Sequence, residues 1–426
     1  PYQELPQITA RICGICPVSP HLAAAKACDA IAGAEPTRPA ALLRELMHMG
    51  QFVQSHSMHF FHLAGPDLLL GMDADPAVRN VAGVAQANPD LALKAIRLRA
   101  FGQEIIRLLG GKRVHPIFAV PGGVNTSLAL EDRDRILGQI PEMAKIIQTG
   151  IAVAKQWYEA EAKLVGSFAV MKSGYLGLID KEGGLQFYDG KIRLADQNGI
   201  EIACFDDSRY LEFIGEHVED WSYLKFPFYR PLGWPGGVYR VGPLGRLNMV
   251  DQVGTSLAGK EFAVFRAMNG GHPVEGTLWY HYARLIEDLY AVERIEQLLL
   301  EPDVLSKDVC GESTGFVGEG VGCLEAPRGT LIHHYQTDEN GLVRKANLIV
   351  ATGHNNWAMS KSVDMVAKAY VNGDTLTEGM LNRVEAAVRA HDPCLSCSTH
   401  ALGHMPLVLE LVAPDGSVLD RMARGV

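Results

Sequence analysis

The sequence predicts a mainly α-helical (α+β) fold, with a large multi-helix bundle core and small peripheral antiparallel β-hairpins and sheets. The apolar residues follow a helical period through most of the 426-residue chain. Hydrophobic residues make up 47% of the composition, which is enough for a large core. Asp-Gly and Asn-Gly dipeptides between alternating apolar residues mark a few hairpins. No internal repeat, low-complexity linker or clear domain boundary interrupts this pattern.

The longest regular pattern covers residues 38–62 and predicts a helix. Its core-facing positions recur at alternating steps of four and three, and they are Leu42, Leu46, Met49, Val53, His56 and Phe60. Because His56 lies on this apolar face, we expect a hydrogen-bonded core histidine rather than a ligand. Further helices are expected over 88–108, 130–163, 277–300, 356–371 and 375–390, and Pro141 should mark a start or a kink.

Turn residues predict where the small β-elements lie. Hairpin turns are expected at Asp189-Gly190, Asn198-Gly199 and Asn340-Gly341, and another around Asp415-Gly416. The stretch 225–245 is rich in proline and glycine, so we expect an ordered, irregular loop over the core.

Composition limits the classes of partner. The net charge is −10 and no dense Lys/Arg run occurs, so we expect no nucleic acid. No apolar stretch reaches the roughly 20 residues of a membrane span, and no signal-peptide pattern opens the chain. Eight cysteines are too sparse for a disulfide scaffold, so a reducing compartment is expected. The chain opens at Pro1 close to a dense motif, and we expect that an upstream segment is missing.

Two C-x-x-C pairs lie near opposite ends of the chain, Cys13 to Cys16 and Cys394 to Cys397. Eight cysteines in 426 residues would give only about 0.15 such pairs by chance, so a shared role is predicted. The others lack ligand-like spacing and are expected to be small buried hydrophobic residues: Cys28, Cys204, Cys310 and Cys323.

Four thiolates can hold several metals. Their chemistry points first to zinc or to an iron–sulfur cluster. Structural zinc motifs usually bring together pairs that are a few dozen residues apart, whereas here the whole fold must join them. A thioredoxin-like motif needs one pair in a βαβ context, which is not evident. The spacing alone therefore leaves the metal open.

The residues around both pairs resemble a known family. RICGICPVS (11–19) and DPCLSCSTH (392–400) are similar to the two signatures of nickel–iron hydrogenase large subunits. HPIFAVPGG, GPLGRLN, EAPRGTLIH and ATGHNNWAM, which begin at residues 115, 242, 325 and 351, also resemble that family. The resemblance covers essentially residues 1–400 as one catalytic domain. ITARICGICPVS, YLEFIGEHVEDWSYLKFPFY and DPCLSCSTHALG are most similar to the cytoplasmic, bidirectional NAD-reducing enzymes.

The resemblance implies reversible heterolytic cleavage of H2 to protons and electrons. It makes Cys13 and Cys394 terminal nickel ligands, while Cys16 and Cys397 bridge nickel to an iron that carries carbon monoxide and cyanide. Soft thiolates suit such a centre. Heterolysis needs a metal to take the hydride and a base to take the proton, and Cys394 can be that base.

Further roles are carried over from the same motifs. Arg328 is expected over the open metal position, where it donates hydrogen bonds or stabilises charge, and Asp392 is expected to pair with it. Pro327 and Thr352 match positions that contact the cyanides. Taken without the motif, Arg328 could equally be a buried structural arginine paired with Glu325 or Asp392.

The family also implies a third ion and a removable tail. His400 and the backbone carbonyl of His354 match ligands of magnesium. Residues 401–426 resemble a maturation extension that a dedicated protease removes, so cleavage between His400 and Ala401 is expected.

Some positions depart from the family. Pro20 stands where the first signature has a histidine, and His21 follows it; Ser55 replaces an aspartate common in uptake enzymes. His115 has two readings: it simply pins a loop, or it lies where the family places it, between the metal site and the partner protein. The expected missing N-terminal segment would carry the family's proton-exit glutamate and a magnesium carboxylate.

Released electrons need a path through partners. This chain has no further cysteine set for a relay cluster, so the resemblance implies an iron–sulfur small subunit, together with a flavin and iron–sulfur diaphorase pair that meets NAD. No Gly-rich phosphate loop follows a strand here, so NAD itself should bind elsewhere. Two other classes stay open: a non-catalytic relative such as a complex I quinone-site subunit, and a zinc-thiolate structural protein. Metal content separates the three.

Overall fold

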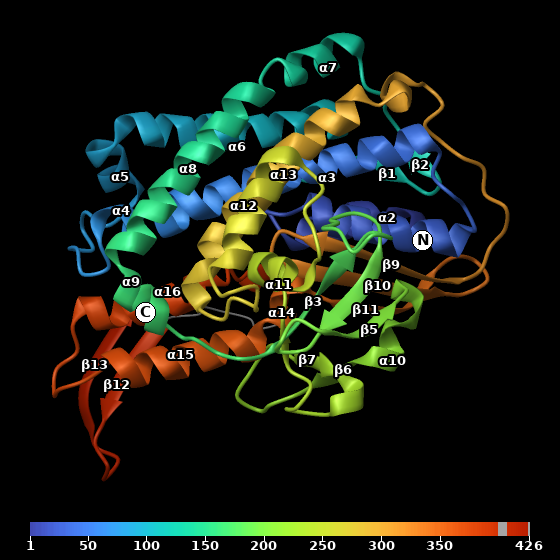
Figure 1. The fold of residues 1–426 in the computed structure, drawn as a ribbon. Coiled ribbons are helices and arrows are strands. Elements are labelled where there is room, and N and C mark those ends of the chain that lie inside the picture. The colour runs from blue at the N-terminus through green and yellow to red at the C-terminus, as the bar shows by residue number, and fades with distance from the viewer. Residues whose placement is uncertain (399–406, 425–426) are drawn as a thin grey trace.

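The computed structural model describes residues 1–398 and 407–424, and long helices dominate it (Figure 1). Five of them form the body of the molecule: α2 (Val18–Ala32), α3 (Arg38–Met58), α6 (Pro89–Gly110), α8 (Ile140–Ala160) and α13 (Tyr280–Leu300). α3 packs against α6 and α13, and α13 packs against α8, so the main hydrophobic core lies between these helices. None of the helices in the described ranges combines the length and apolar character needed to cross a bilayer.

Other helices surround this body. They are α1 (Leu5–Thr9), α4 (Gly65–Leu70), α5 (Val81–Ala87), α7 (Leu130–Leu137), α9 (Ala162–Ser167), α10 (Tyr210–Phe213), α11 (Gly242–Met249), α12 (Ser256–Ala267), α14 (Ala351–His354), α15 (Asn356–Tyr370), α16 (Glu378–Ala390) and α17 (Leu395–Ser398).

The strands form small sheets. They are β1 (Ala119–Val120), β2 (Gly123–Val124), β3 (Gly174–Ile179), β4 (Lys191–Ala195), β5 (Glu201–Phe205), β6 (Ile214–His217), β7 (Phe226–Tyr229), β8 (Tyr239–Arg240), β9 (Glu319–Ala326), β10 (Gly329–Thr337), β11 (Val343–Ile349), β12 (Leu407–Val412) and β13 (Val418–Arg424). One sheet has the order β11-β10-β9 and another β5-β4-β3-β8, while β1-β2, β6-β7 and β12-β13 are pairs.

The predicted helices are present, which confirms the fold class. The 38–62 helix is α3, continued by a π-helical segment over His59–Ala64, and the side chain of Thr37 caps its start by accepting from the Ala40 amide. The predicted 130–163 helix is divided into α7, α8 and α9, and Pro141 lies in the first turn of α8, so it marks a start. α2 was not predicted, because it is buried on nearly all sides and shows no polar face.

The hairpin predictions are correct at three of four turns. Asn198-Gly199, Asn340-Gly341 and Asp415-Gly416 connect β4 to β5, β10 to β11 and β12 to β13. The prediction of a tight hairpin turn at Asp189-Gly190 is wrong, because this dipeptide lies at the end of the longer connection from β3 to β4. The stretch 225–245 is also more regular than expected, since it contains β7 and β8, and β8 pairs with β3 in parallel. That sheet is therefore mixed rather than purely antiparallel.

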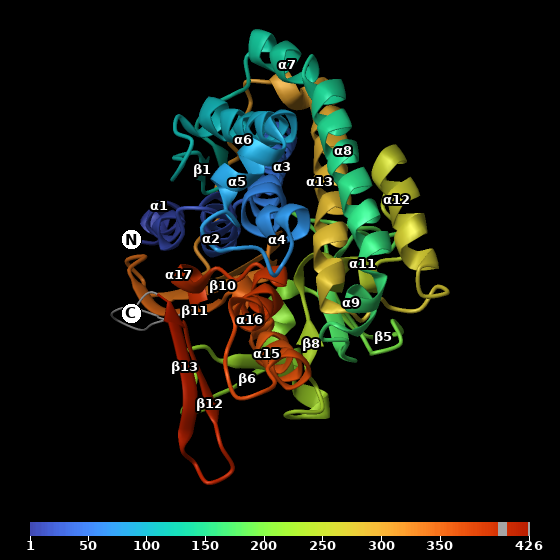
Figure 2. The same cartoon turned by 90° about the vertical axis from the view of Figure 1, so that its left-hand side faces the viewer.

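One helix–sheet contact positions the two ends of the chain. α2 packs on β9 and β10 so closely that a Cβ at Gly322 would lie 2.2 Å from the Ala23 carbonyl oxygen. α2 begins just after the first cysteine pair, and the β9–β10 turn carries Arg328. Figure 2 shows α2 and α17 on the same side of the molecule, with the β12–β13 hairpin extending away from the body.

Candidate metal centre

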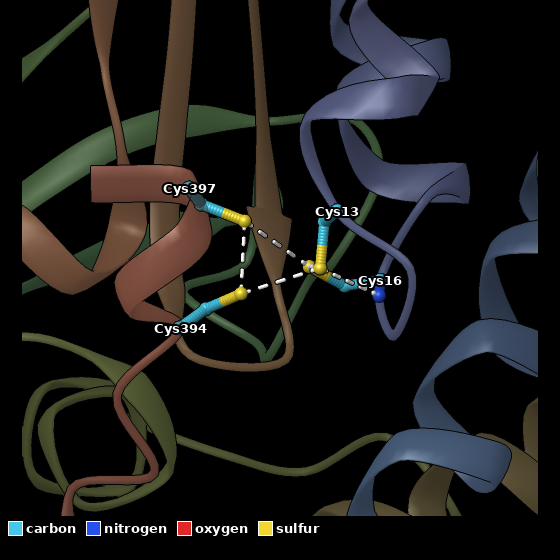
Figure 3. Close-up of side chains that lie close together, drawn as sticks. All are labelled: Cys13, Cys16, Cys394 and Cys397. Atoms are coloured by element: carbon cyan, nitrogen blue, oxygen red, sulfur yellow. Dashed lines mark hydrogen bonds between the residues drawn. The ribbon is translucent and has the colours of Figure 1, made fainter. Parts of the chain in front are cut away.

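The four predicted cysteines meet although they come from opposite ends of the chain. Cys13 and Cys16 lie in the loop between a 3₁₀ turn at Ala10–Ile12 and α2, while Cys394 precedes α17 and Cys397 lies within it. The Sγ atoms are 3.0 Å apart for Cys13 and Cys16, 2.9 Å for Cys394 and Cys397, and 3.2 Å for Cys13 and Cys394. All four lie within 4.8 Å of one another and point to a common centre (Figure 3).

The geometry and chemistry of this set suit a metal. None of the four forms a disulfide; Cys13, Cys16 and Cys394 are buried, and Cys397 is half-buried. Bonds of about 2.3 Å to one ion place thiolate sulfurs roughly 3–4 Å apart, and the Sγ pairs that are in contact here are 2.9–4.0 Å apart. Backbone amides of Ile15 and Cys16 donate to the Cys13 sulfur and hold the first loop around it.

Electrostatics in the cluster favour thiolates at some positions and thiols at others. Hydrogen bonding from Cys16 lowers the pKa of Cys13 to about 7. Hydrogen bonds from Cys13 and the other two cysteines, with help from Arg328, lower the pKa of Cys394. Contacts with the neighbouring thiolates and burial raise the pKa values of Cys16 and Cys397. Four thiolates together therefore need further positive charge, which a metal centre would supply.

Arg328 is the cation that faces the thiols. It lies at the β9–β10 turn with 3% exposure; burial opposes its charge, but Asp392 and the thiols of the cluster outweigh burial and raise the pKa of its guanidinium. Its Nε donates to the Asp392 backbone carbonyl at 2.6 Å, and Nη2 donates to the Asp392 carboxylate at 3.0 Å. Nη1 lies 3.4 Å from the Ser55 hydroxyl. The predicted pairing with Asp392 is present, whereas Glu325 pairs with another arginine, Arg246.

A small apolar cavity of about 30 Å³ borders the thiols. Its lining includes Cys16, Cys394, Cys397, Arg328, Thr352, Pro20, Ala326, Leu331 and Val350. The Thr352 hydroxyl also accepts from the Cys394 amide at 2.9 Å, so it fixes the start of the second cysteine loop. Pro327 is outside the lining found for this cavity among the described residues, and its carbonyl accepts from Arg246.

Of the two predicted magnesium ligands, one lies within the described residues. His354 is buried, and its Nδ1 lies 2.8 Å from the Tyr239 hydroxyl. His400 lies outside the described residues.

The departures from the family pattern have clear structural consequences. Pro20 lines the cavity, but the His21 ring turns away from it, with Nδ1 2.8 Å from the Pro6 carbonyl and Nε2 accepting the Ala119 amide. His21 therefore does not replace the family's histidine at the thiols. The His115 Nδ1 lies 2.9 Å from the Ala10 carbonyl and ties its loop to the segment before Cys13.

Predictions for the remaining histidine and cysteines have mixed outcomes. His56 is a buried core histidine whose Nε2 lies 3.0 Å from the Glu287 carboxylate, as predicted. Cys28 and Cys323 are buried as expected. The prediction is wrong for Cys204 and Cys310, which are exposed because they lie on the edge strand β5 and in a surface loop.

Two groups of polar residues near the site were not predicted. Gln51 and Gln54 on α3 both donate to the Ile15 carbonyl, so they support the loop between Cys13 and Cys16. Arg246 holds the strand ends beside Arg328. The sequence feature that could have revealed these residues is the presence of polar side chains on otherwise apolar helix faces. A polar group that is buried in this way requires a hydrogen-bond partner.

A helical body that brings four cysteine thiols together beside a buried arginine fits a protein with a thiolate-bound metal centre. The family model described as nickel-dependent hydrogenase matches residues 2–88 and 187–400. The chain belongs to this nickel-dependent hydrogenase family, which confirms the family and enzyme class that the sequence predicts.

Similar proteins agree with this assignment. The chain is 42% identical over 440 residues to the NAD-reducing hydrogenase HoxS subunit beta of Cupriavidus necator, covering 100% of this chain and 90% of that protein. It is 44% identical over 368 residues to one subunit of the vhu F420-non-reducing hydrogenase of Methanococcus voltae, covering 86% and 87%. The crystal structure of an NAD⁺-reducing nickel–iron hydrogenase in the H2-reduced state matches with a TM-score of 0.91 and 44% identity, covering 94% and 89%.

Proposed function

We propose that this chain cleaves H2 heterolytically and reversibly at a nickel–iron centre held by Cys13, Cys16, Cys394 and Cys397. The observation that carries the proposal is the convergence of these four thiols beside the buried guanidinium of Arg328. A structural zinc site accounts for four thiolates but gives no role to a buried cation beside them. A non-catalytic relative has no need to keep all four thiols.

The proposed ligand roles are those that the family motifs imply. Cys13 and Cys394 would be terminal nickel ligands, and Cys16 and Cys397 would bridge nickel and iron. Both proposed bridging residues line the cavity, as does Cys394; the cavity's apolar walls suit carbon monoxide, and Arg328 in the same lining suits an anionic cyanide. Thr352 reaches the same cavity, so it would contact a cyanide. The proposed contact between Pro327 and a cyanide rests on the family motif and not on the cavity lining.

The protein residues divide the work of heterolysis among them. When bound, nickel and iron would supply a Lewis acid, which polarises H2 and accepts its electron pair. Cys394 would accept the proton, because the neighbouring thiols and Arg328 lower its pKa and so keep its sulfur deprotonated and available. Since the pKa of Arg328 is raised, its guanidinium stays protonated and acts as a hydrogen-bond donor to developing charge rather than as a base. Asp392 fixes its direction through two contacts.

Infrared spectroscopy combined with metal analysis tests the proposed centre. The full-length protein would be purified with its partners from a host that supplies hydrogenase maturation factors. We expect bands of metal-bound carbon monoxide and cyanide, with nickel and iron near one each per chain. Zinc without such bands would contradict the proposal and indicate a structural thiolate site.

We also propose magnesium at His400 and the backbone carbonyl of His354, and removal of residues 401–426 by a maturation protease. The hairpin in this tail extends away from the helical body, which suits a removable element (Figure 2). Mass spectrometry of nickel-loaded protein should show a chain that ends at His400. A nickel-loaded chain that keeps residues 401–426 would disprove the cleavage.

Electrons from H2 would leave through a partner. Several exposed apolar side chains lie on and near the first cysteine loop, and they are Ile8, Ile15, Val114 and Ile117. Such a surface suits an iron–sulfur small subunit beside the metal centre. The NAD-reducing relatives support onward transfer to NAD through a flavin and iron–sulfur diaphorase, in the cytoplasm.

A further inference from the structure

A buried arginine lies directly behind the turn that carries Arg328. Arg246, on α11, has no exposed surface, and all five of its N–H donors are used. Nε and Nη2 each donate to Glu287 at 2.6 Å, and Nη1 donates to Glu325 at 2.6 Å. The two remaining donors reach the carbonyl oxygens of Ala326 and Pro327, both at 3.0 Å.

These carbonyls belong to the two residues that precede Arg328 at the β9–β10 turn. The turn is also held at Gly329. Gly329 has a φ of +141°, and a Cβ there would lie 2.2 Å from the Val241 side chain. Val241 is itself fixed, because its amide donates to Asn355 and its carbonyl accepts from Tyr280. Arg246 and Val241 therefore both hold the turn in place.

The charges explain why an arginine is needed at this position. Its single positive charge lies between Glu287 and Glu325, and both carboxylates are fully buried. A lysine keeps the charge, but its three donors lack the planar fork that reaches two carboxylates and two carbonyls together. His56 also contacts Glu287, and Thr330 donates to Glu325, so the carboxylates are fixed from other elements as well. The network is rigid enough to set the direction of the turn.

We propose that Arg246 is a positioning residue for the hydrogenase reaction: it holds the Ala326 and Pro327 carbonyls so that the Arg328 guanidinium stays over the metal-binding thiols. The proposal rests on the proposed function, because it assigns to Arg328 the role given there. Arg246 acts through this turn and touches neither the thiols nor the substrate.

A double-mutant cycle tests this role on the loaded complex. Arg246→Lys should lower kcat about 10- to 100-fold, as expected for a misplaced catalytic group, and should shift the cyanide and carbon monoxide infrared bands while nickel is retained. If Arg246 acts through Arg328, the double variant with Arg328→Lys should be no slower than Arg328→Lys alone. A merely structural role predicts instead that the two losses multiply, and that result, or unchanged infrared bands, would overturn the proposal.

Arg44→Lys is the matched control. Arg44 is also fully buried and also donates to a carboxylate and to backbone carbonyls, namely Asp29, Val120 and Gly123, but it lies away from the Arg328 turn. Thermal unfolding should show that Arg44→Lys also destabilises the fold, yet its kcat and infrared bands should match the unsubstituted protein. A loss of kcat in this control equal to that of Arg246→Lys would overturn the proposal.

Glu287→Gln provides a second variant if Arg246→Lys does not fold. It leaves Arg246 balanced by one carboxylate, Glu325, while weakening the two-point hold of Glu287. The infrared bands should shift in the same direction by a smaller amount, and unchanged bands would overturn the proposal. Failure of the proposed function would look different, because the unsubstituted protein would then lack nickel and the bands altogether.

Discussion

Cys394→Ser should abolish hydrogen turnover, with a loss of more than about 10³-fold in the rate of H2 oxidation. The serine is nearly the same size, but its hydroxyl is a poor ligand for nickel and does not ionise near neutral pH. Two proposed roles are therefore lost together, nickel ligand and proton acceptor. Nickel content by elemental analysis should fall in parallel with the rate.

Cys28→Ser is the matched control for this variant. Cys28 is also buried, and its thiol donates to the Tyr2 carbonyl at 3.1 Å, a contact that a serine hydroxyl can also make. We expect full nickel content and unchanged turnover. If Cys394→Ser kept nickel and at least a tenth of the turnover, Cys394 would be neither a required ligand nor the base.

Arg328→Lys should lower kcat about 10²- to 10³-fold while nickel and iron stay bound, because the four thiols remain intact. The lysine keeps a positive charge. However, it cannot hold both the carbonyl and the carboxylate of Asp392 and still present a donor to the centre. Turnover with an artificial electron acceptor, measured beside metal content and infrared spectra, separates this loss from a failure of assembly.

Arg240→Lys controls for replacing a buried arginine. Arg240 is also fully buried, and it donates to Ser173 and to the carbonyls of Met171 and Glu275, away from the thiols. This variant should lose stability but keep its kcat. An Arg328→Lys enzyme with the same kcat as the unsubstituted protein would show that Arg328 is only a structural arginine.

Much of the fold was visible in local sequence patterns, because helix periodicity and turn chemistry depend on near neighbours. The stripe over 38–62 predicted α3, and Asn340-Gly341 predicted the β10–β11 turn. α2 was missed because burial on nearly all sides removes the apolar–polar contrast that reveals a helix. Asp189-Gly190 was misinterpreted because such a dipeptide marks a turn without showing which strands the turn joins.

The sequence by itself determined the donor set. Two C-x-x-C pairs with their flanking residues identified the family, and with it the kind of metal centre, because ligand chemistry belongs to the residue types themselves. Other long-range contacts around the site were decided only by the tertiary structure. It turned His21 away from the thiols and placed Arg246 behind the turn that carries Arg328. Such contacts join residues far apart in the chain, so packing of the whole core fixes them and no local pattern records them.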